Sequence, residues 1–308
     1  MAPITDSNVF LDMDPGIDDA LAMVTALARL NVRGVTTVAG NVSLAQTFHN
    51  AHFVLEQAGR RLPVFAGAEG PLFYPLLTAH HIHGTSGLGD AIASSGHHAI
   101  PSERAWTWLA AAVSHQRGPC HLIATGPLTN IALLLLAFPE VSQQLASITC
   151  MAGGMPGTRL DKDVDFNVFV DPHAADAVFR YGIHLRLVGI NVTHRARVRL
   201  ADLDRLDSYG RLGKVLHAML SFYGEKSRGE GGDLNAFPVD DAVAVAAVDA
   251  PDLFRWESLP LTVVLEGPLR GTVVVSPLST KRPPVKVAAD LNVPGFLDWL
   301  WESLSRIT

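Results

Sequence analysis

The sequence has little cysteine, no long apolar run and no cluster of positive charge. Only Cys120 and Cys150 carry thiols, and they are too far apart to form a closely spaced metal-binding pair. Two free thiols fit a reducing compartment, so we expect a cytoplasmic protein without disulfides. The longest apolar run, residues 131–138, is far too short to cross a bilayer, and residues 1–10 lack the features of a signal peptide.

The balance of charge also excludes several kinds of partner. The formal net charge is −6 and basic residues form no run, which argues against nucleic acid and anionic membrane as partners. A neutral or cationic small molecule suits such a surface better. Hydrophobic residues make up 48% and charged residues 18% of the chain, as in a well-packed globular protein. With no repeat, low-complexity tract or linker, we expect a single domain over residues 1–308.

The apolar pattern alternates between strand and helix. Residues 8–13 read as a buried strand, residues 18–30 have helical spacing, and residues 32–40 are rich in β-branched side chains. Such a unit implies parallel strands, so we predict a Rossmann-like α/β fold with a mainly parallel open sheet flanked by helices. Further strands are expected at 61–67, 121–126, 147–154, 185–190, 259–265 and 271–276, helices at 127–138, 171–182, 241–250 and 294–304, and long loops at 68–101 and 224–238.

The most unusual stretch is "FLDMDPGIDDA", residues 10–20, which places four carboxylates around a Pro-Gly turn. Asp12 and Asp14 precede the turn, and Asp18 and Asp19 follow it at the start of the predicted helix. Like charges this close repel one another, and a hard cation with oxygen ligands would offset that cost. One acid here could simply cap the helix. Several acids behind an apolar strand favour a metal site.

Polar residues also follow other predicted strands. Ligands of open parallel sheets bind beyond the carboxyl ends of the strands. Asn41 and Thr125 follow two of these strands, and an acidic segment follows a third. The members of that segment are Asp161, Asp163, Asp165 and Asn167. Because no Cys or His set accompanies these oxygen donors, they select Ca²⁺ or Mg²⁺ over Zn²⁺.

At this point the motifs resemble a known family. "DMDPGIDDA", "TTVAGN", "IHGTSGL", "ATGPLTNIA" and "DFNVFVDPHAA" occur in the order and spacing of the inosine–uridine nucleoside hydrolases. The resemblance covers about residues 8 to 250. It implies a Ca²⁺-dependent enzyme that uses water to cleave the N-glycosidic bond of a ribonucleoside to free base and ribose. It also implies a Rossmann-like sheet and a homodimer or homotetramer.

The resemblance implies roles for individual residues. Asp14 matches a calcium ligand that also acts as the general base for water. Asp19 matches a bidentate ligand, Thr125 would give its backbone carbonyl, and Asp241 would complete the calcium shell. Asn41 matches a catalytic residue near the ribose and the water. The substrate-binding positions are Asp18, His83, Met151, Asp165 and Asn167.

Three positions depart from the pattern of the family. Asp240 stands where many members carry the His that protonates the leaving base, so Asp240 is the candidate acid, with a helix-terminal carboxylate of no catalytic duty as the alternative. Asp165 replaces a Glu and is one methylene shorter. Arg159 stands where an Asn is expected. These changes affect the leaving group and the 5′ end of the sugar site, whereas the motifs for metal and water are intact.

Other residues and functions remain open at this stage. His80 and His81 receive no role, whereas Tyr223, Arg228 and Phe237 could line the base side. One alternative function is a metal-binding relative with an atypical N-riboside substrate, such as a cationic one, or with little turnover. A less favoured alternative is a phosphatase with Asp12 as its nucleophile, because "FLDMD" resembles the DxD motif of that group.

Overall fold

One large sheet forms the centre of the molecule. The computed structural model describes residues 7–89, 98–154, 164–181, 184–227, 234–277 and 281–307. Within these residues the strand order is β10-β9-β11-β6-β5-β4-β1-β2-β3, and β7 and β8 form a separate pair. The strands are β1 Asn8–Met13, β2 Asn31–Thr37, β3 Val64–Ala66, β4 Cys120–Ala124, β5 Leu145–Met151, β6 Leu185–Val188, β7 Arg197–Arg199, β8 Ala236–Pro238, β9 Phe254–Val263, β10 Val273–Val275 and β11 Pro284–Leu291.

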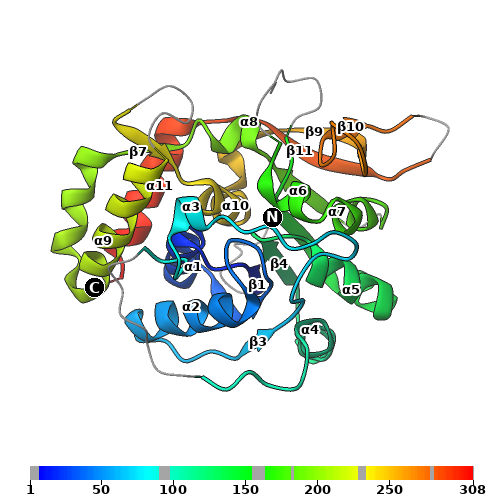
Figure 1. The fold of residues 1–308 in the computed structure, drawn as a ribbon, viewed down its shortest axis with the longest axis horizontal. Coiled ribbons are helices and arrows are strands. Elements are labelled where there is room, and N and C mark those ends of the chain that lie inside the picture. The colour runs from blue at the N-terminus through cyan, green and yellow to red at the C-terminus, as the bar shows by residue number, and fades with distance from the viewer. Residues whose placement is uncertain are drawn as a thin grey trace.

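The sheet is parallel from β3 to β11 and antiparallel beyond it. Strands β1 to β6 and β11 pair in parallel, whereas β9 pairs antiparallel with both β11 and β10. Figure 1 shows this extension on the opposite side of the molecule from α9 Gly210–Lys226. The short strands β3 and β10 form the two edges of the sheet. The predicted Rossmann-like α/β fold with a mainly parallel sheet is confirmed.

Helices cover both faces of the sheet, as a parallel sheet requires. Besides α9, the longer ones are α1 Ile17–Arg29, α2 Leu44–Gln57, α4 Ala105–Ser114, α5 Thr129–Ala137, α7 Pro172–Phe179, α10 Asp240–Asp249 and α11 Val293–Ser305. The short ones are α3 His80–His83, α6 Phe166–Val170 and α8 Ile190–Thr193, with 3₁₀ turns at Pro139–Gln143, Leu200–Ser208 and Pro251–Leu253. No helix in the described part of the chain combines the length and the apolarity needed to span a bilayer.

Strand β1 shows how the two faces are filled. Successive side chains of a strand point to opposite faces. Val9, Leu11 and Met13 accordingly join the core formed with α1, α2, α10 and α11, whereas Phe10 joins the core formed with α4, α5 and α7. All six residues of β1 are buried. Asp14 directly follows this buried strand. It therefore lies where the carboxyl ends of the parallel strands come together.

The predicted elements are confirmed with small changes of boundary. The helices expected at 18–30, 127–138, 171–182, 241–250 and 294–304 correspond to α1, α5, α7, α10 and α11, and every expected strand is present. The sequence analysis missed α2, α4, α6, α8, α9, β7 and β11. The loop expected at 68–101 contains α3, and the loop at 224–238 contains β8; residues 90–97 and 228–233 lie outside the described residues.

Candidate active site

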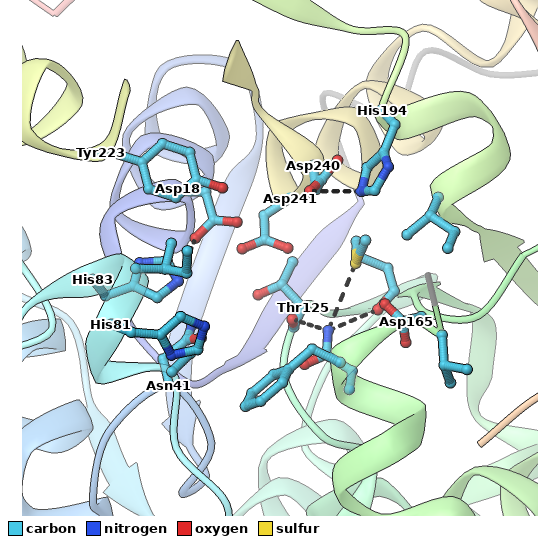
Figure 2. A pocket seen from close by; sticks show the side chains of 17 residues that line it. Asp18, Asn41, His81, His83, Thr125, Asp165, His194, Tyr223, Asp240 and Asp241 are labelled. Atoms are coloured by element: carbon cyan, nitrogen blue, oxygen red, sulfur yellow. Dashed lines mark hydrogen bonds and ion pairs between the residues drawn. The ribbon is translucent and has the colours of Figure 1, made fainter. Parts of the chain in front are cut away.

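A cavity of about 500 Å³ opens beyond the carboxyl ends of the parallel strands. Strands β1, β2, β4 and β5 all end below it. Figure 2 shows the side chains that line it, and these come from α1, α3, α6, α9 and α10 as well as from the turns after the strands. The cavity brings together nine of the residues proposed from the sequence: Asp18, Asn41, His83, Thr125, Met151, Asp165, Asn167, Asp240 and Asp241. Asp14 and Asp19 lie beside them and are more deeply buried.

The turn after β1 is held by hydrogen bonds to its own acids. The backbone N–H of Asn41 donates to Asp14 Oδ2 at 2.7 Å, and the backbone N–H of Gly16 donates to Asp19 Oδ2 at 2.9 Å. Glycine is required at position 40, because a Cβ there would lie 2.1 Å from Asp14 Oδ2. The Asn41 side chain bridges the two acids, since its Nδ2 donates to the Asp14 carbonyl at 3.2 Å and to Asp19 Oδ2 at 3.1 Å. Both acids are thus fixed before any ligand arrives.

Thr125 connects this turn to the neighbouring strands. Its hydroxyl donates to Asp19 Oδ1 at 2.7 Å. Its carbonyl, the proposed calcium ligand, accepts from Nδ2 of Asn167 at 2.7 Å, and the same amide donates to the Met151 carbonyl at 3.1 Å. A carbonyl oxygen has two lone pairs, so this contact leaves one acceptor position on Thr125. Met151, Asn167 and Thr125 therefore form one continuous wall of the cavity.

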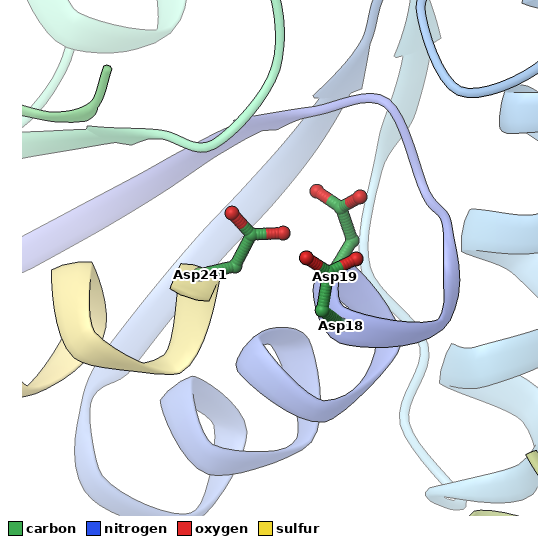
Figure 3. A group of neighbouring side chains, drawn as sticks. All are labelled: Asp18, Asp19 and Asp241. Atoms are coloured by element: carbon green, nitrogen blue, oxygen red, sulfur yellow. The ribbon is translucent and has the colours of Figure 1, made fainter. Parts of the chain in front are cut away.

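Three carboxylates face one another at the base of the cavity. Asp18, Asp19 and Asp241 each offer an oxygen atom, and these atoms all lie within 4.8 Å of one another (Figure 3). Asp18 Oδ1 is buried and has no hydrogen-bond partner within the described residues. Asp19 and Asp241 are 0% and 3% exposed. An all-oxygen donor set of this kind fits a hard cation such as Ca²⁺ and offers none of the sulfur or nitrogen ligands typical of zinc.

Burial shifts the titration of these acids strongly. It raises the pKa of Asp18 to about 7 and that of Asp19 to about 6. The nearby charge of Asp240 adds to the shift of Asp18, and the charge of Asp18 adds to the shift of Asp19. Burial and nearby carboxylates also raise the pKa values of Asp14 and Asp241 well above the ordinary range. Bringing charged carboxylates this close is unfavourable unless positive charge is supplied. The cluster therefore fits the cation expected from the sequence.

One end of the cavity is aromatic. The His83 ring lies parallel to the Tyr223 ring, with 5.4 Å between their centroids, and Phe237 packs edge-on behind Tyr223. The backbone N–H of Ile17 donates to His83 Nδ1, which therefore carries no proton. Burial lowers the pKa of His83 to about 4, so near neutral pH its Nε2 carries the only ring proton. His81, to which the sequence analysis gave no role, also lines this end.

The other end of the cavity is polar. Asp165 is 5% exposed, burial raises its pKa to about 6, and its Oδ1 accepts from the backbone N–H of Val168 at 2.9 Å as the cap of α6. Asp240 Oδ2 lies 3.8 Å from His194 Nε2. The sequence analysis missed His194. The signal that could have found it is the one that selected Asn41 and Thr125, because His194 follows the carboxyl end of a parallel strand, β6.

Asp12 does not take part in the cavity. It is completely buried, and its Oδ1 accepts from the Thr36 hydroxyl at 2.6 Å and from Asn130 Nδ2 at 2.8 Å. A phosphatase nucleophile must reach its substrate, so this placement argues against the DxD alternative. Four residues singled out in the sequence lie outside the described residues: Arg159, Asp161, Asp163 and Arg228.

Comparisons with known proteins settle the family. The family model described as "Inosine-uridine preferring nucleoside hydrolase" matches residues 9–298. The chain belongs to this nucleoside hydrolase family. Curated relatives include a non-specific ribonucleoside hydrolase, RihC, of Escherichia coli, 35% identical over 302 residues with 96% of this chain and 98% of the relative covered. A pyrimidine-specific ribonucleoside hydrolase, RihA, of Salmonella paratyphi A is 33% identical over 303 residues, with 96% and 97% covered.

Solved nucleoside hydrolases share the whole fold. The plant nucleoside hydrolase PpNRh1 matches with a TM-score of 0.90 and 29% identity, over 97% of this chain and 99% of the other. A purine-preferring ribonucleoside hydrolase from Gardnerella vaginalis matches with a TM-score of 0.91 and 26% identity, over 98% and 99%. The resemblance inferred from the motifs is therefore confirmed, and so is the assignment of the chain as a nucleoside hydrolase enzyme.

Proposed function

We propose that this nucleoside hydrolase cleaves ribonucleosides by a Ca²⁺-dependent route in which Asp14 activates the attacking water. The observation that carries the proposal is the buried cluster of Asp18, Asp19 and Asp241 at the base of the cavity, with Asp14 linked to Asp19 through the Asn41 side chain. Asp14, Asp19, Asp241 and the Thr125 carbonyl would hold the ion. When bound, calcium supplies positive charge that keeps the acids ionised and positions water and sugar hydroxyls.

Asp14 takes the proton from water in this mechanism. The backbone N–H of Asn41 donates to Asp14 Oδ2, and Asp14 Oδ1 would take the proton. Asn41 keeps Asp14 and Asp19 in place through its side-chain amide. As the N-glycosidic bond breaks, positive charge develops on the ribosyl ring, and the surrounding carboxylates stabilise that charge.

The sugar is held by groups on two sides of the acid cluster. Asp18 offers to a ribose hydroxyl a buried oxygen that has no hydrogen-bond partner within the described residues and lies 3.9 Å from His83 Nε2. Asn167 and Met151 line the opposite wall. Asp165 closes the polar end. The base would lie against the aromatic end, where the His83 and Tyr223 rings provide flat surfaces. Relatives that accept pyrimidine or mixed nucleosides make inosine and uridine the first substrates to test.

Protonation of the leaving base is assigned to Asp240 in this proposal. Its carboxylate lies at the rim of the cavity, with one side-chain oxygen near His194. The alternative is a relative that holds N-ribosides but turns them over little, or accepts only a base that leaves without protonation. A substrate panel that includes a cationic N-riboside separates these two cases. We also propose a homodimer or homotetramer, which light scattering on the purified chain would test.

The experiment is a reducing-sugar assay on inosine, uridine, cytidine and nicotinamide riboside, with calcium present or chelated. We expect calcium-dependent release of ribose. Asp14→Asn should lower kcat/KM by about 10²- to 10⁴-fold, the range typical of a lost general base. The matched control is Asp252→Asn, which removes the same charge from an exposed position. Full activity after chelation, or in Asp14→Asn, would contradict the mechanism.

A further inference from the structure

The segment that carries His83 is attached both to Asn41 and to the turn after β1. The first half of this segment, residues 79–89, lines the aromatic end of the cavity (Figure 2). The backbone N–H of Ala79 donates to the Asn41 carbonyl at 3.0 Å. The backbone N–H of Ile17 donates to His83 Nδ1 at 3.2 Å. The segment and the turn that holds the acids are therefore joined at two places by the residues that line the site.

Asn50 of α2 provides a third attachment, although it does not line the cavity. Its Nδ2 donates to the Ser86 carbonyl at 2.9 Å and to the Pro15 carbonyl at 2.8 Å. A carbonyl oxygen only accepts hydrogen bonds, so the amide nitrogen of Asn50 has to face both groups. Ser86 lies three residues after His83, and Pro15 directly follows Asp14. The Asn50 side chain is 3% exposed, so one buried amide joins the loop after His83 to the turn after Asp14.

The backbone of the loop comes very close to Asn50. Gly87 has a φ of +82°, and a Cβ there would lie 2.7 Å from Asn50 Nδ2. The Ser86 hydroxyl donates to the Gly89 carbonyl at 2.9 Å and accepts from the backbone N–H of Leu88 at 3.2 Å. Leu88 is 2% exposed and belongs to the core. The loop is therefore an ordered turn, and glycine is required where its backbone approaches the amide.

We propose that Asn50 is a positioning residue that holds His83 in a fixed place relative to the acids. It acts through the Ser86 carbonyl on one side and the Pro15 carbonyl on the other. Without its amide, two carbonyl groups lose a buried donor, which is costly, and the loop moves relative to the turn. A displacement of about 1 Å on one side of an active site costs about 10²-fold in rate. The inference rests on the proposed function for the role of His83 beside the base.

The test is a double-mutant cycle in the calcium-loaded protein, on the nucleoside that the wild type cleaves best. Asn50→Ala should lower kcat/KM by about 10- to 100-fold. His83→Phe keeps the ring and removes its nitrogens. In that background Asn50→Ala should cost less than about threefold, because its effect passes through His83. Gly87→Ala displaces the loop while α2 keeps its sequence, and it should give the same pattern in both backgrounds.

Two controls separate positioning from a general loss of stability. Gln46→Ala removes the hydrogen bond from Gln46 Nε2 to Asn50 Oδ1 but leaves both donors of Asn50 in place, so kcat/KM should not change. Arg282→Ala weakens the fold at an ion pair with Asp176 that does not line the cavity. It should have the same small effect on kcat/KM with and without His83→Phe.

Several outcomes would overturn the inference while leaving the proposed function intact. One is an Asn50→Ala variant that keeps its full cost in the His83→Phe background, because independent effects add. Another is loss of the calcium-dependent gain in Tm in Asn50→Ala. That result would assign Asn50 to the metal-binding turn, whose acids accept hydrogen bonds from Asn41 and Gly16 without its help.

An outcome without turnover is handled by hydrogen exchange. If the wild type cleaves no nucleoside, the proposed function fails, but the position of the loop can still be measured. In Asn50→Ala and in Gly87→Ala the backbone N–H groups of Leu88 and Gly89 should exchange at least about tenfold faster than in the wild type, with exchange in β1 unchanged. Equal exchange at Leu88 and Gly89 in the variants and the wild type would refute the inference.

Discussion

Calcium should stabilise this protein much more at pH 8 than at pH 6. The reason is that the acids at the base of the cavity are ionised only partly in the metal-free protein. Burial raises the pKa of Asp18 to about 7 and that of Asp19 to about 6, against ordinary values near 3.8. In the metal-free state these groups favour folding at low pH, and that contribution is lost as the pH rises through the raised values. Calcium binding favours the ionised forms of Asp19, a proposed ligand, and of Asp18, whose oxygen lies within 4.8 Å of those of Asp19 and Asp241.

These two groups give a lower limit for the effect, because burial also raises the pKa values of the proposed ligands Asp14 and Asp241. Between pH 8 and pH 6 the ionised fraction falls about tenfold for a pKa of about 7 and about twofold for a pKa of about 6, so calcium affinity falls by at least about twentyfold. Calcium at about 100 times its Kd at pH 8 adds about 2.7 kcal/mol, and the same concentration at pH 6 adds at most about 1 kcal/mol. With 308 residues, 1 kcal/mol corresponds to about 1.5 °C in Tm. The gain should be about 4 °C at pH 8 and under about 2 °C at pH 6.

Differential scanning calorimetry with and without calcium, at constant ionic strength, measures these gains. Asp19→Asn is the matched variant, because it removes one buried oxygen ligand from the cluster and should abolish most of the gain at both pH values. A gain of equal size at pH 6 and pH 8 would refute the reasoning that links the buried carboxylates to the ion. A gain that survives intact in Asp19→Asn would show that calcium binds elsewhere on the protein.

Two further substitutions test the close packing at the site and away from it. Gly40→Ala should displace the Asp14 carboxylate, since its Cβ would lie 2.1 Å from Oδ2, and kcat/KM should fall by about tenfold or more. A Cβ at Gly70 would lie 3.8 Å from Leu76 Cβ, an ordinary contact, so Gly70→Ala should leave kcat/KM unchanged in the same assay. Arg282→Ala should lower the free energy of unfolding by about 3 kcal/mol at neutral pH in urea titrations. It removes the buried ion-pair partner of Asp176 at 2.8 Å and leaves only the exposed Arg180 paired with that carboxylate. Since the pKa of Asp176 lies below its ordinary value, that loss should shrink as the pH falls below about 4.

Much of the site could be predicted from the sequence because its residues obey local rules. The acids around the Pro-Gly turn lie on one short stretch, so their proximity needs no knowledge of the distant chain. The positions of Asn41 and Thr125 in the site could be predicted because each follows a parallel strand, and ligands bind beyond the carboxyl ends of such strands. Asp241 is different, because it reaches the cluster only through the packing of α10 against α1. Its place came from the resemblance to the family and not from the pattern of residues.

The elements that were missed depend on long-range packing. Helix α9 contains Gly213 and Gly224, which weaken a helix on intrinsic preference alone. Each is required by a neighbour, since a Cβ at Gly213 would lie 2.0 Å from the Leu206 carbonyl oxygen and one at Gly224 would lie 2.8 Å from the Phe237 ring. Strand β11 begins with Pro284 and is defined by pairing with β9 and β6. His194 lies beyond β6 but is separated from it by α8, so its position near the carboxyl ends of the strands depends on how α8 folds.

The edges of the central sheet limit how two copies of this chain can join. Both edge strands, β3 and β10, are only three residues long. Adding a strand from a second copy at either edge would create few backbone hydrogen bonds, and short edges of this kind protect proteins from uncontrolled aggregation. We therefore expect subunits to join through side chains of helices and loops and not by pairing of β3 or β10 with a strand of a second copy.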